Sequence, residues 1–260
     1  MLRFEKKTAL ITGASSGIGK AFAEALAAGG ANVILVARSS NKLNLLAAAI
    51  TKQYRVNAKV IVADLREEKA PGKIYTTVQK FRLPVDMLIN NAGFGTHGLF
   101  HVQSTEVEYD EIMVNVSALV QLTHLFLPGM LKKKDGIIVN VASNAAFQPV
   151  PYMAVYGATK AFVLSFSEAL WAEYRKDGIR VLALCPGATD TNFSKVVGTE
   201  DSMVGRKRST DSVVATALKA LERGKSCAID GNLNYLLANL IRLSPRGVTA
   251  KMTAQVMKPK

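Results

Sequence analysis

A tyrosine and a lysine four residues apart are the side chains best suited to proton chemistry in this chain. Tyr156 and Lys160 belong to the segment Tyr-Gly-Ala-Thr-Lys, inside a long apolar pattern of helical period. Side chains at this spacing share one helix face. A free phenol ionises only near a pKa of about 10, but a neighbouring ammonium favours the phenolate and eases proton transfer. The pair alone is also common on ordinary helix surfaces, so its meaning depends on its surroundings.

A glycine-rich segment near the start of the chain could hold phosphate groups. Residues 12–19 read Thr-Gly-Ala-Ser-Ser-Gly-Ile-Gly, between a short β-branched run and an alanine-rich helical pattern. Glycines permit a tight turn and a close backbone approach, and the following helix begins with free N–H groups. Many turns need glycine, but this position between the first strand and the first helix predicts dinucleotide binding. The candidate contacts are Gly13, Ser15, Ser16, Gly17, Ile18 and Gly19.

The end of the second expected strand indicates which dinucleotide is bound. An acidic residue there would hold the ribose 2′-hydroxyl of NAD, whereas this chain continues Ala37, Arg38, Ser39. A guanidinium suits a 2′-phosphate and a carboxylate would repel it. Arg38 could instead be a solvated cation after the strand. The missing acid favours NADP(H).

Alternation of short apolar runs with longer helical patterns indicates the fold that positions these residues. The pattern predicts an α/β doubly wound Rossmann fold: a mostly parallel seven-stranded sheet with helices on both faces and ligands at the carboxyl ends of the strands. We expect one catalytic domain over residues 1–230. The predicted strands are Thr8–Ile11, Val33–Ala37, Lys59–Ala63, Met87–Asn90, Gly136–Val141, Val181–Cys185 and Cys227–Ile229. The predicted helices are Gly17–Ala28, Asn41–Tyr54, Gly72–Phe81, Val107–Leu131, Met153–Lys176 and Asp211–Arg223.

Composition narrows the function classes further. The 260 residues include only two cysteines, Cys185 and Cys227, and no cysteine or histidine spacing resembles a metal site. The beginning of the sequence resembles a strand rather than a signal peptide, and uninterrupted apolar runs are too short to span a bilayer. We therefore expect a cytoplasmic protein without a metal.

Positive charge gathers toward the end of the chain. Residues 1–202 carry 22 basic and 17 acidic side chains, whereas residues 203–260 carry 11 and 3. A solvated basic surface explains this excess, and no nucleic-acid motif accompanies it. Residues 231–260 form a helical tail with five basic and no acidic side chains. Its apolar positions at helical spacing favour packing on the domain or at an interface, with peripheral membrane contact as the alternative.

Several motifs in order resemble the short-chain dehydrogenase/reductase family over about Lys6 to Ile229. They are the glycine turn, Asn-Asn-Ala-Gly from Asn90 to Gly93, Ser143 thirteen residues before Tyr156, the Tyr156–Lys160 block, and Cys-Pro-Gly from Cys185 to Gly187. Within the family the chain is most similar to NADP-dependent ketoreductases, including steroid and 3-oxoacyl reductases.

The resemblance implies a role for four residues in catalysis. Tyr156 would be the general acid of reduction and the general base of oxidation. Lys160 would bind the nicotinamide ribose and keep the tyrosine pKa low. Ser143 would donate to the substrate oxygen, and Asn115 would hold a water that links Lys160 to solvent. Ser143 could otherwise cap the next segment, and Asn115 could be a core polar residue.

The resemblance also implies the remaining cofactor contacts. Asp64 would contact the adenine amine, with Leu65 beside it. The adenosine side would be lined by Asn90, Ala92 and Gly93, and the nicotinamide side by Pro186, Gly187, Thr189 and Thr191. Three departures from the family pattern are Ser16 where some NADP-using members carry a basic residue, Ala142 in place of a second serine, and Thr189 in place of an aliphatic residue.

These features together predict an NADPH-dependent oxidoreductase that interconverts a carbonyl and an alcohol. A lid over about residues 188–210, with apolar and basic side chains, indicates a hydrophobic ketone or a 3-oxoacyl or steroid-like substrate. The family resemblance implies a homodimer or homotetramer formed through the helices near Asn115 and Tyr156. The alternative is a non-catalytic NADP-binding sensor or scaffold, which the presence of all four catalytic residue types argues against.

Overall fold

The computed structural model describes residues 3–193, 197 and 207–259, and its centre is a single parallel sheet. Seven strands pair in the order β3-β2-β1-β4-β5-β6-β7. Their bounds are β1 Thr8–Thr12, β2 Asn32–Ala37, β3 Ala58–Val62, β4 Met87–Asn90, β5 Gly136–Val141, β6 Ile179–Cys185 and β7 Cys227–Ile229. Every pairing is parallel, which confirms the predicted doubly wound fold.

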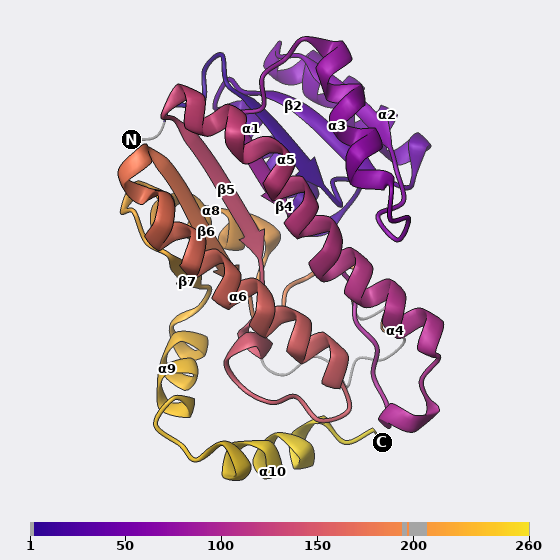
Figure 1. Cartoon of the computed structure of the whole chain (residues 1–260), viewed down its shortest axis with the longest axis vertical. Helices are drawn as coiled ribbons and strands as arrows, with labels where there is room; N and C mark the ends of the chain where they lie inside the picture. The colour runs from indigo at the N-terminus through magenta and orange to yellow at the C-terminus, as the bar shows by residue number, and fades with distance from the viewer. Residues whose placement is uncertain (1–2, 194–196, 198–206, 260) are drawn as a thin grey trace.

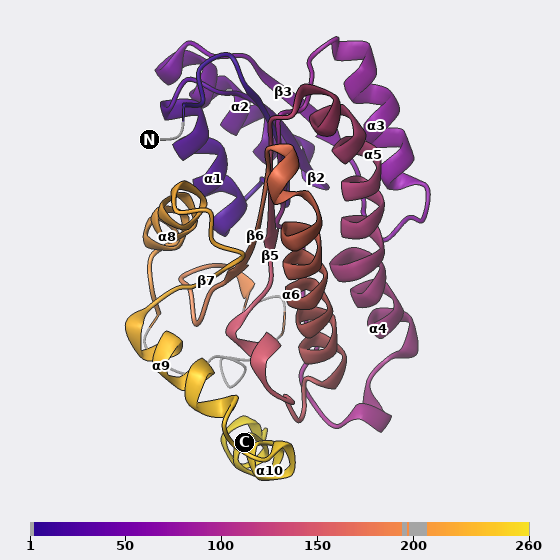
Figure 2. The same ribbon diagram turned by 60° about the vertical axis from the view of Figure 1, so that its left-hand side comes forward.

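Helices cover both faces of this sheet, as Figure 2 shows. One face carries α1 Gly17–Ala28, α2 Ser40–Tyr54 and α8 Thr210–Glu222. The other carries α3 Ala70–Phe81, α5 Ala118–Lys133 and α6 Ala154–Tyr174. Because both faces are covered, β1, β4 and β5 are buried along their whole length. This explains why these strands are nearly continuous apolar runs in the sequence.

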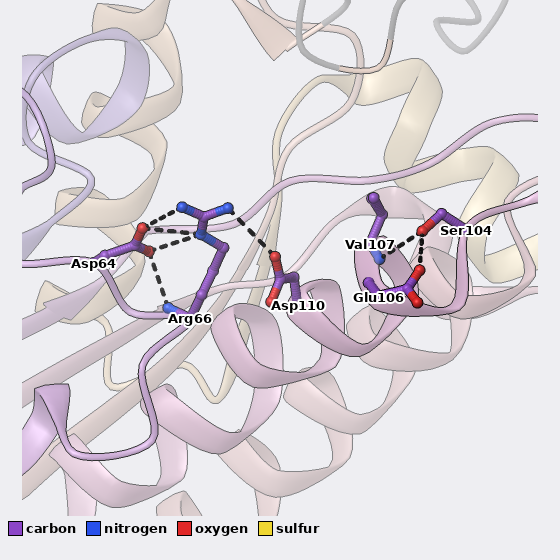
Figure 3. A network of polar contacts seen from close by, with 6 residues as sticks. All are labelled: Asp64, Arg66, Ser104, Glu106, Val107 and Asp110. Carbon is purple, nitrogen blue, oxygen red and sulfur yellow. Dashed lines mark hydrogen bonds and ion pairs between the residues drawn. The ribbon is translucent and has the colours of Figure 1, made fainter.

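The helix predicted over Val107–Leu131 is longer and interrupted. It consists of α4 Thr105–Ile112, a π-helical turn at Met113–Ser117, and α5. The hydroxyl of Ser104 caps the N-terminus of α4 by accepting a hydrogen bond from the Val107 amide (Figure 3). A π turn places one extra residue in a helix and changes the direction of the following side chains. Here the turn contains Asn115.

The same helix, Thr105–Lys133, is long and apolar enough to cross a membrane by length and composition alone. The sequence prediction rests on uninterrupted apolar runs, and polar residues inside this helix, among them Asn115, Gln121 and His124, break such a run. In the fold, α5 packs on α3 and on β4 and β5. Its apolar side chains therefore serve the protein core.

Two further helices follow the last strand. They are α9 Asn232–Ile241 and α10 Arg246–Met257, the yellow segments in Figure 1. Helix α9 contacts β7 and the 3₁₀ turn η3 Asn144–Phe147. At the end of α10, the Nε2 atom of His97 lies 2.9 Å from the carbonyl oxygen of Met257. The tail thus returns to the carboxyl end of the sheet.

Candidate active site

A cavity of about 560 Å³ lies at the carboxyl ends of the parallel strands. It receives residues from the turns after β1, β2, β3, β4, β5 and β6, and from helices α6 and α10. This is where an open parallel sheet offers a crevice for a ligand. Most of the residues predicted for the site line it: Gly13, Ser15, Ser16, Gly17, Ile18, Arg38, Ser39, Asp64, Leu65, Ala92, Gly93, Ser143, Tyr156, Lys160, Pro186, Gly187, Thr189 and Thr191.

The glycine-rich turn after β1 has no room for side chains at its first glycine. Gly13 has φ +65°, and a Cβ there would lie 2.8 Å from Asn91 Nδ2 and 3.0 Å from the Ala92 Cα. The Thr12 hydroxyl fixes this contact by accepting hydrogen bonds of 3.0 Å from the amides of Asn91 and Ala92. Helix α1 begins at Gly17, so its free N–H groups face the cavity end of the turn. This cradle fits the diphosphate of a dinucleotide.

Two basic side chains lie beside the turn after β2. Arg38 and Lys42 both line the cavity, Arg38 directly after the strand and Lys42 in the first turn of α2. The sequence predicts Arg38 and Ser39 as contacts at this place but gives no signal for Lys42. Lys42 follows Arg38 by four residues and belongs to the first turn of α2, which begins at Ser40. The pair offers positive charge where a 2′-phosphate would lie.

The carboxylate of Asp64 is already engaged by a neighbouring guanidinium (Figure 3). Arg66 Nε donates to both Asp64 oxygens at 3.0 and 2.9 Å, and Arg66 Nη1 lies 3.4 Å from Asp110 on α4. The hydrogen bonds from Arg66 lower the pKa of Asp64. Arg66 also lines the cavity. The carboxylate that is predicted to contact the adenine amine is thus one whose orientation Arg66 fixes.

Tyr156, Lys160 and Ser143 meet at one wall of the cavity. Lys160 Nζ donates to the Val141 carbonyl at 2.9 Å and lies 5.7 Å from the centroid of the Tyr156 ring. Both side chains belong to α6, whereas Ser143 follows β5. Gly95 lies against the Tyr156 ring, where a Cβ would be 2.8 Å from a ring carbon. The hydroxyl of Ser143 accepts from the Ala145 amide at 3.1 Å, so it caps the next turn as well as facing the cavity.

The pKa of Tyr156 differs from the sequence prediction. Burial raises the pKa of Tyr156 to about 12, while a hydrogen bond with Ser143 opposes the rise. Burial lowers the pKa of Lys160 to about 8. This rise is opposite in direction to the predicted lowering by Lys160, because desolvation disfavours the charged phenolate. The site therefore holds a phenol, which is the form that donates a proton.

Asn115 is buried, and its side chain makes three hydrogen bonds within the protein. Its Oδ1 accepts from the Phe94 amide at 3.1 Å, and its Nδ2 donates to the Phe94 carbonyl at 2.9 Å and to Thr159 Oγ1 at 3.0 Å. It joins the turn after β4 to α6 rather than lining the cavity. The water that the family resemblance implies for Asn115 stays a prediction.

Two predicted cofactor contacts lie outside the cavity. Asn90 ends β4 with its side chain buried, donating to Thr123 Oγ1 at 3.1 Å and Asn140 Oδ1 at 2.9 Å. Successive strand residues point to opposite faces, so Asn91 reaches the cavity instead. Gly19 lies beneath the turn, where a Cβ would be 2.5 Å from both Asn91 Nδ2 and the Gly13 carbonyl oxygen. Its role is close packing rather than ligand contact.

From the sequence alone, no role is predicted for five residues that build the site, which are Thr12, Lys42, Arg66, Asn91 and Met257. A signal was present for Asn91, since Asn-Asn follows an apolar strand and only one of the two side chains can face the ligand. No sequence signal distinguishes Arg66 or Lys42 from the other basic residues, of which the chain has 33 in all.

The substrate side of the cavity is apolar. Val150, Met153 and Phe193 line it, together with Met257 from α10. The Phe193 and Tyr156 ring centroids are 5.3 Å apart. Most of the predicted lid, at 194–196 and 198–206, lies outside the described residues. Its far end is held by Arg208, whose Nε lies 2.5 Å from the buried carboxylate of Asp230.

The fold and the site agree with the result of a comparison of the sequence with models of known protein families. Residues 7–202 match the family model described as short chain dehydrogenase. The chain belongs to the short chain dehydrogenase family.

Among curated proteins, the chain is 39% identical over 194 residues to a very-long-chain 3-oxoacyl-CoA reductase of Anas platyrhynchos, covering 72% of this chain and 61% of that protein. It is 38% identical over 190 residues to the inactive hydroxysteroid dehydrogenase-like protein 1 of Homo sapiens, covering 72% and 57%. The chain thus spans less than two thirds of the length of these relatives.

Among solved structures, a short-chain dehydrogenase from Sphingobium yanoikuyae in complex with NADPH is 33% identical, with a TM-score of 0.84. The similarity covers 93% of this chain and 94% of that one. A 7beta-hydroxysteroid dehydrogenase is 26% identical with a TM-score of 0.85, covering 95% and 96%. The seven-stranded architecture is therefore shared along nearly the whole chain.

Proposed function

We propose that the chain is an NADPH-dependent oxidoreductase that interconverts a carbonyl and an alcohol. The observation that carries this proposal is that Tyr156, Ser143 and Lys160 line the same cavity as the glycine turn and Arg38. Proton-transfer groups and a nucleotide cradle thus line one cavity. The NADPH complex of the Sphingobium yanoikuyae protein supports the choice of cofactor.

The residues of this chain divide the reaction between them. The glycine turn would hold the diphosphate, and Arg38 with Lys42 would hold the 2′-phosphate. NADPH, when bound, supplies the hydride. Ser143 donates a hydrogen bond to the carbonyl oxygen as negative charge develops there. Tyr156 gives its phenolic proton to that oxygen, which becomes the alcohol hydroxyl, and the phenolate is then reprotonated from solvent with Lys160 beside it.

The proposed substrate is a hydrophobic ketone, of the 3-oxoacyl or steroid-like kind. The apolar wall of Val150, Met153, Phe193 and Met257 supports it, because apolar side chains cannot satisfy a polar substrate body. The names of the relatives, a 3-oxoacyl-CoA reductase and a hydroxysteroid dehydrogenase, point to the same two classes.

NADPH oxidation against a panel of ketones tests this proposal, with 3-oxoacyl thioesters, steroids, sugars and quinones as members. We expect turnover with one of the first two groups and its loss in the Tyr156→Phe variant. NADPH binding without turnover of any member would instead favour the second candidate, a non-catalytic NADP-binding sensor or scaffold. The similarity to an inactive human relative is the observation that favours that candidate.

We also propose that the protein is a cytoplasmic homo-oligomer. Exposed apolar side chains on α4 and α6, among them Tyr109, Ile112 and Phe162, offer a surface on which a second copy can pack. Light scattering of the purified chain tests this, and a monomer at micromolar concentration would contradict it.

A separate surface on the tail supports contact of the protein with an anionic membrane. Helix α9 exposes Leu233, Leu236 and Leu240, and residues 231–260 carry five basic and no acidic side chains. Two copies of this basic tail would repel each other, whereas an anionic lipid surface would attract the tail. We expect co-sedimentation with phosphatidylglycerol vesicles and little with phosphatidylcholine alone. Equal recovery with both, or replacement of Leu236 by Ser without effect, would refute it.

A further inference from the structure

Glu111 is a buried carboxyl for which the proposed reaction has no role. It lies in α4 and is 0% exposed. The neighbouring acids of this helix behave differently: Glu106 contacts the Ser104 cap, and Asp110 pairs with Arg66 at the surface (Figure 3). Carboxyl groups are rarely buried without a partner, because the loss of hydration is costly. The position of Glu111 therefore needs an explanation.

Only one of its oxygens is paired. Oε2 accepts from Thr96 Oγ1 at 3.0 Å, while Oε1 has no hydrogen-bond partner among the described residues. Asn115, one helical turn further, holds Phe94 of the same turn after β4. Thus two side chains of one helix face hold the turn that runs past Tyr156 and Lys160. A structural anchor at Thr96 needs only one oxygen and no charge.

The charge of Glu111 acts on the catalytic pair. Helix α4 packs against α6, which carries both Tyr156 and Lys160. Ionised Glu111 raises the pKa of Lys160 and also that of Tyr156. Among the described charged groups, Lys160 and Glu108 act on Glu111 in return. Burial raises the pKa of Glu111 itself to about 7, so its charge changes in the neutral range.

We propose that Glu111 is a positioning residue whose carboxylate holds Lys160 as an ammonium and Tyr156 as a phenol, and so favours carbonyl reduction over alcohol oxidation. This inference rests on the proposed function. Reduction needs the phenol, which gives its proton to the carbonyl oxygen. Oxidation needs the phenolate, which takes the proton of the alcohol. A negative charge beside the pair stabilises every protonated form and disfavours the phenolate.

The substitution Glu111→Gln removes the charge of this side chain and keeps its shape. The amide keeps an oxygen that can accept from Thr96, and it removes the ionisable group. We expect the alkaline limit of carbonyl reduction to move to lower pH by about one unit, which is about tenfold in rate on that limb. The acid limit of alcohol oxidation should move to lower pH as well, because the phenolate forms more readily. Reduction at about pH 6, where Glu111 is mostly neutral, should change little.

Thr96→Val is the matched control. It removes the hydrogen bond to Glu111 and leaves the carboxyl in place. If Glu111 served only as an anchor, both variants would lower activity at every pH without moving either limit. Under the proposal, the variants differ: Thr96→Val loses a hydrogen bond that lowers the pKa of Glu111, so that pKa should rise further.

A readout on the cofactor-free chain keeps this inference separate from the proposed activity. With ¹³C-labelled glutamate, nuclear magnetic resonance should show one carboxyl signal, missing from Glu111→Gln, that titrates near pH 7. Titration near the ordinary value of 4.5, or an unmoved reduction limit in the Gln variant, would overturn the proposal. If Glu111→Gln does not fold, a titration midpoint of Glu111 that is the same in Thr96→Val as in the wild type would overturn the proposal equally. A missing carbonyl reductase activity with a normal titration would instead count against the proposed function alone.

Discussion

Lys160 Nζ lies 5.7 Å from the centroid of the Tyr156 ring and is tied to the Val141 carbonyl, so the ammonium faces the phenol from one helical turn away without bonding to its oxygen. Burial is the largest influence on both groups: it raises the pKa of Tyr156 to about 12 and lowers the pKa of Lys160 to about 8. The pair is therefore a neutral acid beside a cation that is costly to bury.

Tyr156→Phe removes the proposed acid and leaves the ring packing against Phe193. We expect carbonyl reduction to fall by about 10²- to 10⁴-fold, the usual contribution of general acid catalysis. NADPH affinity, measured by fluorescence titration, should change by less than about threefold, or under 1 kcal/mol. A variant that keeps its full activity would show that another group protonates the substrate.

Lys160→Met removes a buried charge, so it should inactivate the protein and stabilise it. Between the folded pKa of about 8 and the unfolded value of 10.5, the unfolded chain binds more protons, and the stability of the wild type rises with pH. The free energy of unfolding at pH 7 should therefore be about 1–3 kcal/mol larger for Lys160→Met than for the wild type. This advantage should shrink toward pH 10. Chemical denaturation at both pH values measures it, and a variant less stable at pH 7 would contradict the cost assigned to this charge.

Arg38→Asp tests the cation pair beside the cavity. An aspartate would repel the 2′-phosphate and could bind a ribose 2′-hydroxyl. We expect the ratio of kcat/KM for NADPH over NADH to fall by about 10²-fold, or close to 3 kcal/mol. Lys52→Asp, at the far end of α2, makes the same charge change away from the cavity and should leave the ratio unaltered. Equal ratios in wild type and Arg38→Asp would refute the role of Arg38.

Gly13→Ala and Gly224→Ala form a matched pair. Both glycines have positive φ, +65° and +63°, so both substitutions strain the backbone by about 1 kcal/mol. Only at Gly13 would the new Cβ also meet Asn91 and Ala92, whereas at Gly224 nothing lies within 4 Å. We expect a larger loss of thermal stability and a clear loss of NADPH affinity for Gly13→Ala alone. Equal effects of the two variants would mean that the tight contact with the turn after β4 is unimportant.

The order of strands and helices could be predicted from the amino-acid sequence alone. The predicted strands Met87–Asn90, Gly136–Val141 and Cys227–Ile229 and the helix Gly17–Ala28 agree with the structure residue by residue. Buried parallel strands leave unbroken apolar runs, and glycine turns mark their ends, so this information is local. Where a polar residue enters a strand, as Arg180 does in β6, the predicted start was late by two residues.

Which polar side chains face the cavity, and what charge they hold, depends on the packing of the folded chain. Asn90 and Asn91 are equivalent in sequence, but the strand directs one into the core and the other into the cavity. Arg66 and Met257 reach the site from segments with no motif. The pKa of Tyr156 depends on burial and on Glu111, which no spacing reveals. Motifs are set by neighbours in the chain, whereas desolvation and electrostatics are set by neighbours in space.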